Sequence, residues 1–194
     1  MNIFLRAKHW QLFVFNFALP FFLYLILVAV MISQVAGHRH PDPWFFFRFI
    51  PGFLIVGVIS AFVQYAWTWA AAINLMEKVP EELRPDKTFF MVSFFIPIVY
   101  FFLFGIVMLF MFRIAEFSPW ILLPIFPIHI FVIFCSFYCM YFTAKVIKTA
   151  EEKRVVPFID HVLEIVLIWF YPIGIWFLQP RINKLVEEEE KSET

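Results

Sequence analysis

Long uncharged stretches separated by short charged segments dominate the chain and predict membrane-spanning helices. Four stretches run for 25 residues or more without a Lys, Arg, Asp or Glu. About 20 apolar residues in a helix are enough to cross the hydrocarbon core of a bilayer. We therefore expect four spans, at about residues 11–35, 49–75, 88–112 and 119–144. The first is too long for the 7–15-residue apolar core of a signal peptide, which favours a retained helix.

The last apolar segment, at about residues 156–178, has a different pattern. It carries charged residues early, and its uncharged part covers only residues 165–178. Fourteen helical residues reach about 21 Å, short of the roughly 30 Å core. This length is typical of a re-entrant or interfacial segment, which enters the bilayer only partway. An acidic tail, residues 184–194, follows it.

The distribution of Lys and Arg gives a second, independent indication of topology. With four spans and a cytoplasmic N-terminus, 12 of the 15 basic residues lie inside and three outside. A fifth span would change this division to nine inside and six outside. Because positive charge favours the cytoplasmic side, we predict an all-α bundle of four spanning helices plus a half-membrane segment. Five spans remain the alternative.

Composition excludes several classes of protein. Hydrophobic residues make up 63% of the chain and charged residues 15%, whereas soluble domains average about 45–50% and 25%. A chain of 194 residues has too large a surface to hide so much apolar area from water, so the expected partner is the lipid bilayer. The formal net charge is zero, which gives no support for nucleic-acid binding. We expect one integral membrane domain over residues 1–194.

Neither metal nor cofactor binding is predicted. Cys135 and Cys139 are the two cysteines, one helical turn apart, and we interpret them as buried free thiols. Two ligands are too few for a zinc site. Zinc-protease, nucleophile-elbow and nucleotide-binding motifs are absent from the sequence.

Two short segments resemble sequences that recur in small, uncharacterised polytopic inner-membrane proteins of bacteria. They are residues 7–13 and 172–183, together 19 of 194 residues. The resemblance implies residence in the bacterial inner membrane and no particular activity. The second segment combines a Pro/Gly break, an aromatic anchor and a polar exit, a composition that we interpret as a chain turning at the membrane surface.

The strongest candidate for chemistry is the group Asp160, His161 and Glu164. On a helix the three side chains share a broad face, and carboxylates with an imidazole can bind a divalent cation or relay protons. The alternative is the polar N-terminal face of an interfacial helix, where the helix dipole favours acidic residues. We prefer this second interpretation.

Other polar residues lie inside predicted spans. His129 is placed well within the fourth, where an ionisable residue is by default a candidate for function, although a carbonyl freed by Pro124 or Pro127 could bind it. Asn16, Gln64 and Thr68 are interpreted as interhelical hydrogen-bonding groups.

We therefore expect a non-enzymatic partner or assembly component. Gly57 and Ala61 have the spacing that lets two helix backbones approach, so this face and the charged cytoplasmic loops would be its contact surfaces. One alternative is a small transport or permease-like subunit using His129 and the Gln64/Thr68 face. A second alternative is a membrane enzyme using Asp160, His161 and Glu164.

Overall fold

The structure, a computed structural model, describes residues 3–37, 45–113 and 122–192. Within these ranges the chain is helical and contains no strand. Near the N-terminus it forms α1 (Ile3–Arg6), α2 (His9–Phe13), the π-helical segment η1 (Val14–Ala18) and α3 (Leu19–Gly37). The middle contains η2 (Phe45–Arg48), α4 (Ile50–Trp69), the π-helical η3 (Ala70–Asn74), η4 (Leu75–Lys78), η5 (Glu81–Leu83) and α5 (Thr88–Arg113). The C-terminal part consists of α6 (Leu122–Glu152), η7 (Phe158–His161), α7 (Val162–Trp169) and α8 (Tyr171–Ser192).

Among the described residues, four helical stretches are long and apolar enough to cross a membrane, as predicted. They cover His9–Gly37, Ile50–Lys78, Thr88–Val107 and Leu123–Glu152. The fourth continues two turns past the expected end near residue 144, because the mixed charges after Ala144 sit on good helix formers. It ends where Lys153 adopts a left-handed backbone conformation (φ 51°), a common helix terminus. The expected connector after Arg113 lies outside the described residues.

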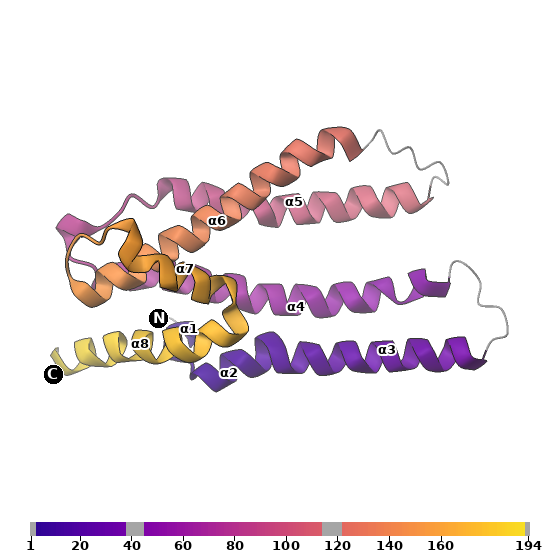
Figure 1. Cartoon of the computed structure of the whole chain (residues 1–194), viewed down its shortest axis with the longest axis horizontal. Helices are drawn as coiled ribbons and strands as arrows, with labels where there is room; N and C mark the ends of the chain where they lie inside the picture. Colours follow the sequence, from indigo (N-terminus) through magenta and orange to yellow (C-terminus); the bar gives the residue numbers. More distant parts are fainter. Residues whose placement is uncertain (1–2, 38–44, 114–121, 193–194) are drawn as a thin grey trace.

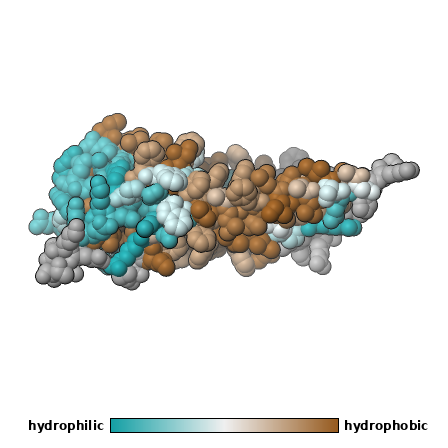
Figure 2. All heavy atoms as spheres, turned by 90° about the horizontal axis from the view of Figure 1, so that it is seen from below, coloured by the Kyte–Doolittle hydropathy of each residue, from teal (hydrophilic) through white to brown (hydrophobic). Residues whose placement is uncertain are grey.

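The long helices form two antiparallel hairpins, one of α3 with α4 and one of α5 with α6 (Figure 1). Both termini, the segment between α4 and α5, and the segment between α6 and α7 lie at the same end of the molecule (Figure 1). Hydrophilic residues gather at this end, and brown apolar surface covers the middle of the bundle (Figure 2). We call the end that holds both termini the charged end.

The last apolar segment enters the bundle and turns back. α7 runs inward from the charged end, the chain breaks at Phe170, and α8 returns to the same end (Figure 1). This confirms the four-span arrangement with a half-membrane segment and contradicts the five-span alternative. The interpretation of residues 172–183 as a turn at the membrane surface is wrong, since the turn lies at the inner tip of the hairpin. Pro172 is the second residue of α8, a position where a missing N–H breaks no bond.

Close backbone contact holds the α7–α8 hairpin. A side chain added at Gly174 would lie 1.8 Å from the carbonyl oxygen of Leu167, so only glycine fits there. The N–H groups of Ile173 and Gly174 both bond to the Phe170 carbonyl, at 2.9 and 2.8 Å. The main-chain groups at this break therefore find partners locally, as the interior of a bilayer requires.

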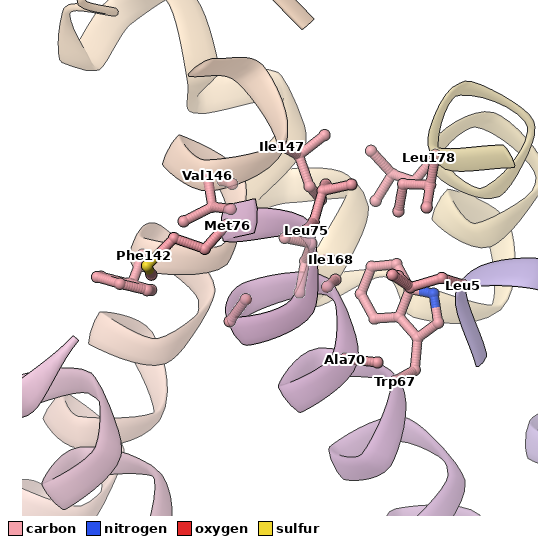
Figure 3. Close-up of a cluster of buried hydrophobic side chains, with 14 of the residues drawn as sticks. Leu5, Trp67, Ala70, Leu75, Met76, Phe142, Val146, Ile147, Ile168 and Leu178 are labelled. Carbon is pink, nitrogen blue, oxygen red and sulfur yellow. The ribbon is translucent and has the colours of Figure 1, made fainter. Parts of the chain in front are cut away.

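Most of the buried core lies toward the charged end. The labelled side chains of Figure 3 come from α1, α4, η3, η4, α6, α7 and α8 and converge around Trp67 and Leu75. Both residues are fully buried. This packing connects the two hairpins to each other and to the re-entrant α7–α8 unit.

A polar pair joins the first two spans. Pro20 has no N–H to donate to the Asn16 carbonyl, and the Ser60 hydroxyl donates to that carbonyl instead, at 2.6 Å. The Asn16 amide donates in return to the Ser60 carbonyl at 2.9 Å. The interhelical role expected of Asn16 is confirmed.

Candidate functional site

A dense group of half-buried charged side chains, with one fully buried carboxylate, lies where α6, α7 and α8 meet. We call Lys148, Glu151, Glu164 and Arg181 the ion cluster. The Arg181 guanidinium donates to Glu151 through two nitrogens and to Glu164 Oε1 at 2.6 Å. Lys148 Nζ lies 4.0 Å from both Glu151 and Glu164. One arginine thus ties the end of α6 and the start of α7 to α8.

Glu164 is the most deeply buried member of the ion cluster, with 2% of its side chain exposed. Its Oε2 has no hydrogen-bond partner among the described residues. The short contacts from Glu151 raise the pKa of Arg181, and Glu164 adds to this shift. The guanidinium therefore stays charged, and the carboxylates have a permanent counterion.

His161 is buried beside the cluster, in surroundings that favour the neutral imidazole. Only 1% of the residue is exposed, and neither ring nitrogen has a partner among the described residues. Its ring packs against Tyr141 and Phe158, with centroids 5.3 and 5.6 Å away. Burial lowers the pKa of His161, because a charged imidazole would lose its hydration there.

Asp160 faces a different environment from its two neighbours. Its carboxylate accepts a hydrogen bond from Arg154 Nη2 at 3.0 Å, in an exposed pair. The three sequence candidates thus separate into a surface ion pair, a buried imidazole packed between aromatic rings and a member of the ion cluster. No group of three His, Cys, Asp or Glu side chains in the described part of the chain is placed to hold a metal ion.

Gln179 forms the second buried polar junction. It is fully buried, and its Oε1 accepts a hydrogen bond from Trp67 Nε1 at 2.7 Å. Its Nε2 lies 2.9–3.1 Å from the carbonyls of Phe4, Leu5 and Ala7. These are carbonyls that the end of the short helix α1 leaves without partners, so Gln179 caps α1 from α8.

The two segments that carry the sequence resemblance, residues 7–13 and 172–183, meet in space. α8 packs on α1 and α2, and His9 lies 4.6 Å from Trp176 between ring centroids. The roles of Gln179 and Arg181 were not predicted. A signal was available, since two polar residues directly after an apolar run would be buried if that run entered the membrane.

The hydrogen-bond partner of His129 lies on α5. Its Nδ1 lies 2.8 Å from the hydroxyl of Tyr100 on α5, so its observed partner is a hydroxyl and not a carbonyl freed by Pro124 or Pro127. Thr68 donates to the Gln64 carbonyl of its own helix at 2.9 Å, so the expectation of an interhelical bond is wrong for Thr68. The Gln64 amide has no hydrogen-bond partner among the described residues, and it lines a cavity with Thr68.

The small-residue face of α4 is partly occupied within the chain. A side chain at Gly57 would lie 3.1 Å from the Tyr24 hydroxyl of α3, and Ala61 is exposed. Gly57 therefore serves packing inside the first hairpin, and only Ala61 is open to another molecule.

Comparison with known proteins gave no match to a family model, to a curated protein or to a solved structure.

Proposed function

We propose that this chain is a non-enzymatic partner or assembly component of the bacterial inner membrane, with both termini in the cytoplasm. One observation carries the proposal: the buried polar side chains near the charged end bind elements of the same chain. Arg181 joins α6, α7 and α8, and Gln179 joins α1, α4 and α8. A catalytic site needs such groups to converge on a space that a substrate can enter.

The orientation follows from charge. Twelve of the 15 Lys and Arg residues belong to segments that gather at the charged end (Figure 1). The positive-inside rule favours the cytoplasm for that end. The resemblance of residues 7–13 and 172–183 to bacterial inner-membrane proteins supports the choice of membrane.

The contact surface that we propose is the segment between η4 and α5. Val79 at its start is buried, but the residues from Pro80 to Lys87 are exposed or half-buried and carry both acidic and basic side chains. A cytoplasmic protein surface of mixed charge would be its complement, since opposed charges steer and orient association. The exposed charged residues of this segment are Glu81, Glu82, Arg84, Asp86 and Lys87.

Photo-crosslinking in living cells tests this surface. A photoreactive amino acid replaces Glu82 or Lys87, and as a control Phe102, an exposed apolar residue of α5. We expect both charged-end positions to give a crosslinked product of one mass and Phe102 to give none. The captured protein should also lose abundance when the chain is deleted. Absence of a product from Glu82 and Lys87 at native expression would refute the proposal.

A small transport or permease-like subunit is the second candidate, favoured by the cavity beside Gln64 and Thr68. It requires that His129→Ala abolishes a transport phenotype without lowering the protein level. The enzyme alternative requires that alanine at Asp160, His161 or Glu164 each abolish an activity while the protein accumulates. The three different environments of these side chains weigh against it.

A further inference from the structure

The cavity beside Gln64 lies deep in the bundle. It has a volume of about 90 Å³ and is bounded by α4, α5, α6 and the tip of α7. Gln64 is 14 residues from either end of the span Ile50–Lys78, or about 21 Å along a helix. The cavity therefore lies near the middle of the bilayer. Its lining residues are Gln64, Tyr65, Thr68, Phe94, Pro97, Ser136, Cys139, Met140 and Ile168.

The lining is polar but carries no charge. Thr68 and Ser136 use their hydroxyl protons on carbonyls of their own helices, at 2.9 and 3.0 Å. The Gln64 amide has no hydrogen-bond partner among the residues that the structure describes. An unpaired amide at this depth costs several kcal/mol, because lipid offers it nothing to bind. A donor is thus held ready at a position where the chain does not use it.

A second unpaired group lies close to the cavity. Ser93 is fully buried, and its hydroxyl makes no hydrogen bond of good geometry in the described structure, its interacting neighbour being the weakly polar Cys135 thiol. It precedes Pro97 by one turn on the same face of α5. Pro97, which lines the cavity, cannot donate to the Ser93 carbonyl. The side of α5 that borders the cavity is therefore also short of hydrogen-bond partners.

The cavity is not fully enclosed, and at this depth the bundle is surrounded by lipid. The α3–α4 and α5–α6 hairpins approach each other near the charged end and diverge beyond it (Figure 1). α6 packs on α4 and on η3, the segment that follows α4. A molecule dissolved in the bilayer could therefore place its head in the cavity and leave its tail in the lipid.

Size and chemistry restrict the ligand. One water needs about 10–15 Å³, so a cavity of about 90 Å³ takes a small head group but not a whole lipid. The absence of charge in the lining excludes a phospholipid head, and the depth requires a neutral molecule. A carbonyl oxygen would accept from Gln64, and a flat head would pack against the rings of Tyr65 and Phe94. We propose that this cavity binds a neutral, lipid-soluble carbonyl compound, a membrane quinone or a diacylglycerol.

Binding can be measured on the full chain in dioleoylphosphatidylcholine vesicles. Decylubiquinone is titrated against tryptophan fluorescence, and dioleoylglycerol is tested as a competitor. We expect a saturable component above simple partitioning. Gln64→Leu should weaken it about fivefold to tenfold, the order expected for one lost hydrogen bond. Ser136→Leu, which fills the cavity but leaves Gln64 in place, should abolish it.

The control is Gln34→Leu, which removes an exposed glutamine of α3 outside the cavity and should leave binding unchanged. Gln64→Leu should not lower the melting temperature of the ligand-free protein, because the amide supports no contact in the chain. Displacement by dioleoylglycerol would identify an acyl ester as the source of the carbonyl, and its failure to displace would identify a quinone. The inference is overturned if quenching of the parent never saturates. It is also overturned if Gln64→Leu and Ser136→Leu both bind decylubiquinone as strongly as the parent does.

Discussion

Pro20 leaves the carbonyl of Asn16 without its helical donor, and a serine from the next span fills that place. The same relation holds at the end of α1, where Gln179 reaches carbonyls that no helical N–H can bind. In both cases a polar side chain from another segment supplies the hydrogen-bond donor that a main-chain carbonyl lacks. At the scale of the residue, these polar side chains are explained by the need of every buried main-chain carbonyl for a hydrogen-bond donor.

Arg181→Met should be strongly destabilising. It leaves Glu164, the deeply buried carboxylate, without its strongest partner, and breaking a buried ion pair costs about 3–5 kcal/mol. Thermal unfolding in detergent measures the loss. The double variant Arg181→Met/Glu164→Gln should recover most of it, because the unpaired charge is gone.

Lys184→Met provides the matched control for Arg181. Lys184 is an exposed cation on the same helix, so its loss should change stability by less than about 0.5 kcal/mol. Equal melting temperatures for Arg181→Met and Lys184→Met would mean that the ion cluster does not hold the three helices together.

His161 should make stability depend on pH. Because burial lowers its pKa in the folded chain, the unfolded chain binds the proton more readily, and folding loses stability as the pH falls below about 6.5. The loss attributable to one such group is at most about 1.4 kcal/mol per pH unit. His161→Phe, which suits the space between Tyr141 and Phe158, should give a shallower slope between pH 7.5 and 5.5. An unchanged slope would show that the imidazole is accessible in the folded protein.

At the scale of the element, the α7–α8 hairpin is the least ordinary part of the fold. Eight residues of α7 extend about 12 Å into the bundle, and the return begins after a single break at Phe170. Exposed apolar side chains on its outer side, such as Trp169, Phe170 and Phe177, face lipid. Its inner side packs on Trp67 and the core.

Gly174→Ala should disrupt this hairpin. The added methyl group would overlap the Leu167 carbonyl, a backbone group that cannot rotate away. We therefore expect the free energy of unfolding to fall by about 3 kcal/mol. Gly105→Ala is the control, since a side chain at Gly105 in α5 would meet nothing within 4 Å. That change should stabilise its helix by up to about 1 kcal/mol. Similar unfolding curves for the two variants would contradict the tight contact.

The sequence predicts these elements better than their contacts. Charge-free length gave the four spans, and the shortness of residues 165–178 gave the re-entrant segment, because both depend only on bilayer thickness. The partnership of Arg181 with Glu151 joins residues 30 positions apart, and no local periodicity indicates it. Pro172 was expected to mark the break, but a proline is tolerated in the first turn of a helix, so the break precedes it.

At the scale of the whole molecule, packing is strongly asymmetric. Nearly all fully buried side chains lie toward the charged end, whereas the outer parts of both hairpins expose apolar residues to lipid. A re-entrant unit is stable only in such an arrangement, because protein must shield its interrupted backbone from lipid. The packed core near the charged end supplies this shield, and both termini lie at the same end.

Cysteine labelling tests this arrangement directly. In a background of Cys135→Ala/Cys139→Ala, which removes the two buried thiols, single cysteines replace Glu82, Lys184 or Phe170. A membrane-impermeant maleimide should label Glu82→Cys and Lys184→Cys only in inverted vesicles, because both belong to the charged end. Phe170→Cys should react from neither side, since the hairpin tip lies within the bilayer. Labelling of Lys184→Cys from the side opposite to Glu82→Cys would require the chain to cross once more between them, and the re-entrant hairpin would then be wrong.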